Sequence, residues 1–143
     1  GVVGTENFWK CIKLYYNKYR DSHATVADFR RVMEEVSGKD LAVFFDQWLI
    51  KPGTLKYSGN WRFDPNKRQV TIKLDQIQTD GSIFKMPMEI AVYYPGLARP
   101  QMQTVQADSR SNVFSISVTG EPDKVVLDPN MWILMDADFR KAD

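Results

Sequence analysis

The feature that most constrains this chain is a change of hydrophobic period at Pro52 and Gly53. Before this point, apolar residues recur every three or four positions, which is the spacing of one face of an α-helix. After it, apolar and polar residues alternate, which is the spacing of a half-buried β-strand. The sequence therefore predicts an α+β fold, with a helical segment at residues 1–53 and a strand-rich domain at residues 54–143.

The last helical stretch, residues 39–53, has the strongest apolar stripe, and Pro and Gly end it. Each aromatic ring on such a stripe can bury about 150–250 Å². We therefore expect the stripe to face a core. Its members are spaced at i, i+3, i+4, i+7 and i+8, and they are Leu41, Phe44, Phe45, Trp48 and Leu49.

Two further helices are expected before it. Thr5 is the expected N-cap of a helix that runs to about Arg20. Thr25, with Asp28 three residues later, predicts a capping box that opens the second helix. Three short helices could form a bundle, but a core that small is marginal alone, so we expect them to pack on something else. The two stripes are Phe8, Cys11, Ile12, Tyr15, Tyr16 and Tyr19, then Phe29, Val32, Met33 and Val36.

From Leu55 onward, the alternation predicts a series of short strands. Gln76 stands where an apolar residue is due and Ile77 follows it, which predicts a β-bulge. The clearest strand, residues 84–94, contains Pro87, whose missing N–H predicts an edge strand or a locally unpaired position. Seven such strands at regular spacing predict an antiparallel sandwich of immunoglobulin-like type. The later candidates are 101–107, 112–119, 123–128 and 132–136.

Composition narrows the partners. Nineteen Lys and Arg residues, scattered along the chain, balance eighteen acidic ones, so we expect no nucleic-acid partner. No apolar run approaches the roughly 18 residues that cross a bilayer, so we expect no membrane span. The single Cys11 rules out an intrachain disulfide and leaves cytoplasmic and periplasmic locations open. The chain begins G-V-V-G without Met, so we expect a piece of a longer protein.

Residues for catalysis or metal binding are sparse. A hydrolytic zinc site needs three protein ligands, and the chain has one histidine, His23, in a polar linker without an H-E-x-x-H motif. Asp136, Asp138 and Asp143 lack an EF-hand pattern and are expected to form a solvated tail. Cys11 lies on an apolar stripe and is expected in a core. We therefore expect no catalytic residue, metal ligand or cofactor in this chain.

Three stretches resemble one family. The run T-V-A-D-F-R-R-V-M-E-E-V-S-G-K-D-L-A-V-F-F-D-Q-W-L, residues 25–49, resembles the end of the catalytic domain in the aminopeptidase N family of zinc metallopeptidases. Residues 6–19 are similar to the preceding helix of that family, and residues 124–136, K-V-V-L-D-P-N-M-W-I-L-M-D, to its last sandwich strands. One departure is that family members usually have P-G-x-P where this chain has P-G-T-L.

The resemblance implies a parent enzyme that removes N-terminal residues from peptides with one zinc ion. The family's zinc motif and its G-x-M-E-N motif have no match here, and Met88–Glu89 lacks the flanking Gly and Asn. Residues 1–53 would then be the end of a thermolysin-like catalytic domain, and residues 54–143 the β-sandwich that follows. The implied partners are the rest of the catalytic domain, the parent's peptide substrates and, through exposed helix faces, a second copy. The implied structural junction is Phe44, Phe45, Trp48, Pro52 and Gly53.

A second hypothesis stays open. The chain is then a stand-alone β-sandwich with a helical cap that binds protein or carbohydrate. Aromatic residues such as Tyr93 or Trp132 would supply its contacts.

Overall fold

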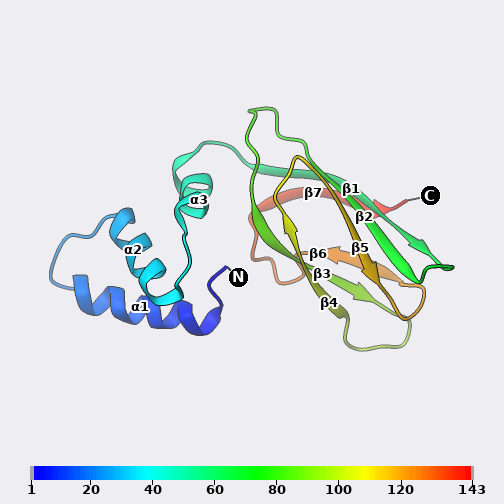
Figure 1. Cartoon of the computed structure of the whole chain (residues 1–143), viewed down its shortest axis with the longest axis horizontal. Helices are drawn as coiled ribbons and strands as arrows, with labels where there is room; N and C mark the ends of the chain where they lie inside the picture. Colours follow the sequence, from blue (N-terminus) through cyan, green and yellow to red (C-terminus); the bar gives the residue numbers. More distant parts are fainter. Residues whose placement is uncertain (1, 143) are drawn as a thin grey trace. The chain divides into compact units, whose positions relative to one another are not determined.

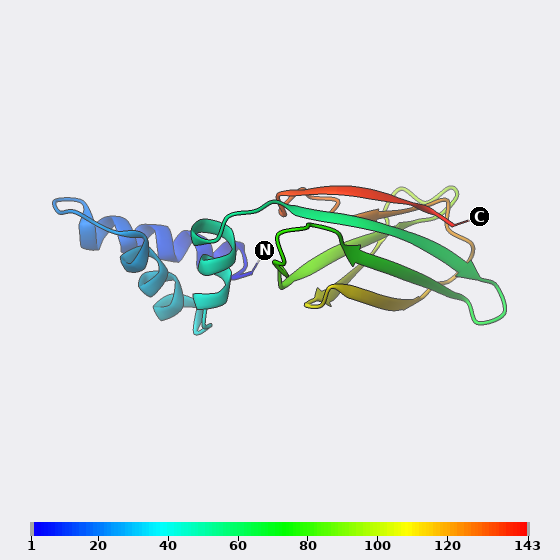
Figure 2. The same cartoon turned by 90° about the horizontal axis from the view of Figure 1, so that it is seen from above.

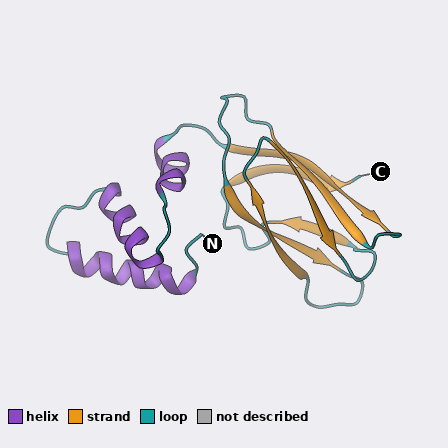
Figure 3. Cartoon of the chain, in the orientation of Figure 1, coloured by secondary structure: helices purple, strands orange, loops and turns teal. Residues whose placement is uncertain are grey.

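The computed structural model describes residues 2–142, and it divides into a helical unit that ends at Pro52 and a strand-rich unit that starts at Gly53 (Figures 1 and 3). The α+β class that the sequence predicts is confirmed. None of the helices formed by residues 2–142 is both long enough and apolar enough to span a bilayer.

The helical unit contains two regular α-helices and a short third one that continues as a π-helix. The predicted capping box is confirmed, because the Thr25 hydroxyl accepts from the Asp28 amide (3.2 Å) and the Asp28 carboxylate accepts from the Thr25 amide (3.0 Å). The prediction of Thr5 as an N-cap is wrong, since the first helix starts at Thr5 and Gly4 caps it. The elements are α1 (Thr5–Tyr19), α2 (Val26–Ser37), α3 (Ala42–Phe45) and η1 (Asp46–Ile50).

Edge-to-face contacts between aromatic rings connect the three helices of this unit. The ring of Phe29 on α2 lies edge-on to Tyr15 of α1, with centroids 5.0 Å apart, and to Phe45 of α3, with centroids 6.1 Å apart. Cys11 is fully buried, as its stripe predicts, and burial raises the pKa of its thiol. The buried cluster consists of Val3, Cys11, Val32, Met33, Leu41 and Phe45.

The strand-rich unit has two sheets (Figure 2). One has the strand order β5-β2-β1-β7 and the other has the order β4-β3-β6. The prediction of a wholly antiparallel sandwich is wrong at one pair, because β7 runs parallel to β1, with Leu55 opposite Met135. The strands are β1 (Leu55–Asp64), β2 (Gln69–Gln76), β3 (Met86–Tyr93), β4 (Gln101–Ala107), β5 (Ser111–Ser117), β6 (Lys124–Leu127) and β7 (Met135–Lys141).

The last strand differs most from its predicted bounds. The expected strand 132–136 is displaced to Met135–Lys141, so Asp136 and Asp138 lie on β7 and not in a solvated tail. Asp143 lies outside the described residues. β7 is an edge strand whose side chains are mostly exposed, so it does not need the apolar alternation by which inner strands are found.

Pro87 lies on the central strand of the smaller sheet. β6 pairs with the stretch Ile90–Tyr93 of β3, and Pro87 precedes that stretch and lies opposite Gln106 of β4. Of the two predictions for Pro87, the edge strand is wrong and the locally unpaired position fits the register, since its missing N–H removes no bond to β6.

The predicted bulge at Gln76 is also wrong. The register of β1 with β2 continues without interruption from Asp64 opposite Gln69 to Tyr57 opposite Gln76. Gln76 therefore keeps the inward parity and is 2% exposed, while Ile77 points outward and is 50% exposed. The irregularity is chemical: a polar side chain occupies a core position.

The Gln76 amide is fully used in the core. Its Nε2 donates to the carbonyls of Phe84 (2.7 Å) and Ser109 (3.2 Å). Its Oε1 accepts from the Phe84 amide and from Nε2 of Gln78, both at 2.8 Å. One side chain thus satisfies four polar groups from two loops, which is how a buried amide becomes compatible with a core.

We expect Gln76→Leu to lower the free energy of unfolding by about 2–4 kcal/mol, because the buried polar groups of Phe84, Ser109 and Gln78 would lose the hydrogen bonds that the Gln76 amide makes, at about 1–3 kcal/mol for each group. Urea denaturation measures the change. Gln103→Leu, at an exposed position on β4, is the matched control and should stay within about 0.5 kcal/mol. Equal effects of the two substitutions would contradict the role given to the Gln76 amide.

Tyr57 is also a buried residue with a polar group, but its hydroxyl is not satisfied as the Gln76 amide is. It is 1% exposed, and its hydroxyl has no hydrogen-bond partner among residues 2–142. Burial raises the pKa of Tyr57 from 10.0 to about 12. An unpaired buried hydroxyl costs about 1–3 kcal/mol, so this ring stabilises the core through its carbons and not through its oxygen.

We therefore expect Tyr57→Phe to be neutral or stabilising. Because the folded-state pKa is raised, the unfolded chain loses this proton first, and stability should fall between pH 10 and about 12. Denaturation of both proteins across that interval separates Tyr57 from the other tyrosines, because only the difference between them reports this residue. A steeper loss in the variant would contradict this assignment.

Candidate functional site

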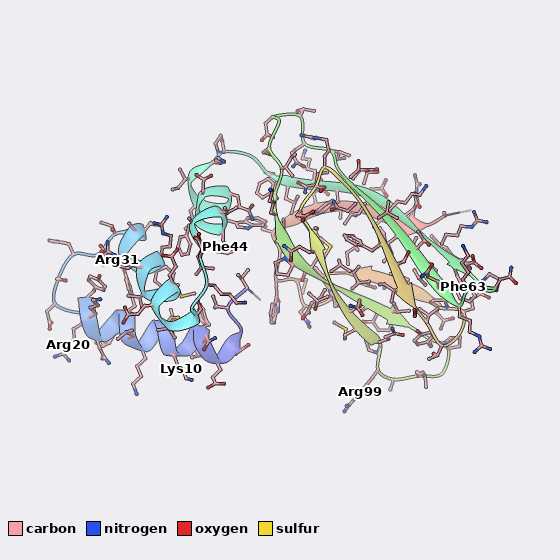
Figure 4. The ribbon with its side chains drawn as sticks, viewed as in Figure 1. Lys10, Arg20, Arg31, Phe44, Phe63 and Arg99 are labelled. Atoms are coloured by element: carbon pink, nitrogen blue, oxygen red, sulfur yellow. The ribbon has the colours of Figure 1, made fainter. Side chains whose placement is uncertain are left out.

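The candidate site is the stretch where the helical unit ends and the strand-rich unit begins. The structure places its predicted residues in different settings. Phe45 is 4% exposed, and Phe44 (Figure 4) packs against it with ring centroids 5.7 Å apart. Trp48 is half-buried on η1, while Pro52 and Gly53 are exposed. Phe44 and Phe45 thus contribute to the helical core.

The third helix is shorter than residues 39–53 and begins at Ala42. Its first amides are satisfied by acidic side chains: Leu41 donates to the Glu34 carboxylate (3.0 Å) and Ala42 to the Asp40 carboxylate (2.8 Å). Glu34 and Asp40 thus supply the acceptors at the start of α3, whose N-cap residue, Leu41, has no side-chain acceptor of its own.

A π-turn ends the helical unit. The Lys51 amide donates to the carbonyl of Asp46, five residues back (2.8 Å), and the Lys51 ammonium lies 2.6 Å from the Asp46 carboxylate. A π-turn holds one residue more per hydrogen-bonded ring than an α-helix, so it changes the phase of the apolar stripe. Gln47 is consequently buried, and the prediction that Leu49 lies on the buried stripe is wrong, since it is 61% exposed.

Gly53 has a backbone that only glycine adopts readily. Its φ is +123°, and a Cβ at this position would collide with the Asp80 carboxylate. That carboxylate accepts from the Ser82 amide (2.9 Å) and hydroxyl (2.6 Å), and these bonds hold the pKa of Asp80 below its usual range. The start of the strand-rich unit is therefore fixed against an ordered loop.

An open hollow of about 280 Å³ lies beside Gly53. Lys56 and Asp80 are its charged groups, and Oδ1 of Asp80 already accepts from the amide and the hydroxyl of Ser82. This lining can hold water or a small polar group, but it offers no pair of nucleophile and base. The lining residues are Thr54, Lys56, Ile77, Gln78, Thr79 and Asp80.

The other predicted chemical residues are dispersed. Within residues 2–142, no three or more His, Cys, Asp or Glu side chains are grouped so that they could hold a metal ion. His23 is exposed between α1 and α2, and Met88 is fully buried on β3. The Glu89 carboxylate accepts from the Asn130 amide (2.7 Å). Of the aromatic contacts of the alternative hypothesis, Tyr93 is half-buried and Trp132 is 53% exposed.

Sequence reasoning missed the polar group that orders the loops near this site. The Arg110 guanidinium donates to the carbonyls of Gln76 (3.2 Å) and Gln78 (3.3 Å). Gln76 and Gln78 both have inward parity, which was the available signal; nothing in the local pattern marks Arg110, because it follows β4 and is distant in sequence.

We expect Gly53→Ala to destabilise the chain by about 1–2 kcal/mol, the cost of forcing a Cβ into a left-handed backbone. Gly120→Ala is the control, because an added Cβ there meets nothing within 4 Å. Thermal unfolding of both variants measures the difference. If Gly53→Ala matched the control, the Asp80 contact would not constrain this junction.

Comparison with known proteins gives relatives of one kind. No family model matches the chain. Aminopeptidase N of Escherichia coli (strain K12) is 33% identical over 75 residues, which cover 52% of this chain and 8% of that protein. Aminopeptidase N of Lactococcus lactis subsp. lactis is 37% identical over 51 residues, which cover 36% of this chain and 6% of that protein. The chain thus spans a small part of the length of the curated relatives that it matches.

The fold is also present in an aminopeptidase. The crystal structure of Legionella pneumophila aminopeptidase A in complex with aspartic acid matches 95% of this chain with a TM-score of 0.76 and 17% identity, and the match covers 16% of that protein. The predicted resemblance is therefore confirmed: in sequence this chain is similar to aminopeptidase N proteins, over stretches that make up a small part of those proteins.

Proposed function

We propose that this chain is a non-catalytic, supporting part of a zinc-dependent aminopeptidase whose full-length form removes N-terminal residues from peptides. The observation that carries the proposal is the similarity to aminopeptidases over a segment that covers only 8% of the Escherichia coli protein. In this proposal, residues 1–53 end a thermolysin-like catalytic domain, and residues 54–143 are an immunoglobulin-like sandwich.

The chain's own residues do not fit a catalytic zinc site. Such a site takes three protein ligands and keeps one position open for water. The one histidine of the chain is exposed, and burial raises the pKa of the one thiol, which keeps it a thiol and not a thiolate ligand. The zinc of the proposed parent would be held by other residues, and no step of its reaction is assigned to this chain.

The surface of the helical unit supports a bracing role. Trp9 and Tyr16 on α1 are 63% and 65% exposed, and Ile50 at the end of η1 is 70% exposed. These side chains lie on faces other than the one that packs on α2 and α3, so the helices have more apolar surface than they cover themselves. In the proposed parent, the rest of the catalytic domain covers this surface; in the isolated chain, it favours self-association.

The junction residues have a defined task in this proposal. Phe44 and Phe45 hold α3 to α2, and the π-turn with Trp48 directs the chain toward Pro52 and Gly53. In the proposed parent, this stretch would connect the end of the catalytic domain to the sandwich that follows.

The test compares two polypeptides from the natural reading frame: these 143 residues and the longer protein that contains them. We expect the longer protein to release amino acids from the N-termini of peptides, to lose activity on metal chelation and to regain it with zinc. The 143-residue chain should be inactive at equal concentration. A reading frame without an H-E-x-x-H motif, or activity unaffected by chelators, would contradict the proposal.

A further inference from the structure

The loop between β6 and β7 exposes large apolar side chains. Met131 is 88% exposed, Leu134 is 79% exposed and Trp132 is 53% exposed. Three exposed apolar side chains of this size within four residues of the chain cost free energy in water and are typical of a contact surface. We call these three residues the β6–β7 apolar patch.

Hydrogen bonds fix the backbone of the loop that contains the β6–β7 apolar patch. The Asp128 amide donates to the carbonyl of Glu89 on β3 (2.7 Å), and the Ile133 amide donates to the Asp128 carboxylate (2.7 Å). The Met131 amide closes the turn on the Asp128 carbonyl (2.9 Å). Asp128 is itself 5% exposed, so the loop is anchored at a buried carboxylate.

The backbone that presents the patch is strained. Asp128 has φ +45° and Met131 has φ +53°, in the left-handed region that non-glycine residues rarely adopt. Each costs about 1–2 kcal/mol relative to the right-handed region. Such strain persists where surrounding contacts over-determine it, and it is concentrated at functional segments. The loop is thus pre-organised to hold three apolar side chains outward.

The size of the patch distinguishes between possible occupants. Three side chains offer only about a few hundred Å² of apolar surface, whereas a standard-size association between separate molecules buries about 800 Å² on each partner. Separate molecules also lose about 4–15 kcal/mol of translational and rotational freedom on binding. A second segment of the same polypeptide loses much less of this freedom on binding, because its effective concentration is high. The patch therefore suits an intramolecular contact.

We propose that the β6–β7 apolar patch docks into an apolar pocket on a segment of the same longer polypeptide that lies outside these 143 residues. The proposal rests on the proposed function, since it needs a longer protein, and the 8% of the Escherichia coli relative covered by its match leaves ample chain for such a segment. The segment must present aliphatic or aromatic side chains around Met131 and Trp132.

Methionine oxidation tests the docking directly. Both the 143-residue chain and the longer protein are treated with hydrogen peroxide, and peptide mass spectrometry follows Met131, with the fully buried Met88 as a protected reference. We expect Met131 to be oxidised rapidly in the short chain and at least tenfold more slowly in the longer one. Equal rates in the two, or protection already present in the short chain, would overturn the proposal.

Paired variants add a thermodynamic readout. Leu134→Ser should lower the unfolding midpoint of the longer protein and leave that of the short chain unchanged. Leu97→Ser, at a loop leucine that is 61% exposed, is the matched control and should change neither. Light scattering must show the longer protein as a monomer while Met131 is protected; protection that appears only in a dimer assigns the patch to a second copy and overturns the proposal.

These outcomes are separable from the proposed function. If the longer protein lacks zinc-dependent peptidase activity but protects Met131, the function fails and the docking stands. If it is an active peptidase with Met131 freely oxidised, the docking fails and the function stands.

Discussion

The buried amide of Gln76 is the interaction on which one end of the strand-rich unit depends. It lies on β2 of the larger sheet, yet its partners are the backbone of Phe84, just before β3 of the smaller sheet, and the carbonyl of Ser109. Arg110 then donates to the carbonyl of Gln76 itself. Apolar packing alone brings sheets together without fixing their loops, whereas directional bonds in a low-dielectric core fix both. The hollow beside Gly53 and the ordered Asp80 loop follow from this arrangement.

Most of the strands could be predicted from the sequence because their alternation of apolar and polar residues follows the alternation of buried and exposed positions. Inner positions such as Ile72, Leu74 and Met88 are fully buried and apolar, and their parity is plain. Prediction failed at positions where the polarity of the side chain does not follow its burial. β7 is an exposed edge strand whose pairing with β1 depends on backbone bonds, and Gln76 is buried through its bonds and not through its apolarity. Long-range partners such as Arg110 leave no local trace.

The prediction for the end of the third helix failed for a different reason. The α-helical spacing places Leu49 on the buried stripe, but the extra residue of the π-turn rotates the chain, so Gln47 is buried in its place. A sequence stripe assumes a constant number of residues per turn, and a π-turn breaks that assumption. The capping box at Thr25 was predictable because its signal is local and chemical, while the π-turn has no comparable signature.

The strand-rich unit has an edge strand with exposed charged side chains and, a few residues earlier, a loop with exposed apolar side chains. The outer edge of β7 has charged side chains at Asp136, Asp138 and Arg140, which discourage pairing with another strand. The same unit nevertheless exposes Met131 a few residues earlier, on a loop held by hydrogen bonds and by unfavourable backbone angles. A chain protected in this way along its edge has no need of an apolar loop for its own stability. In the proposed longer protein, further polypeptide would cover both this loop and the exposed side chains of α1.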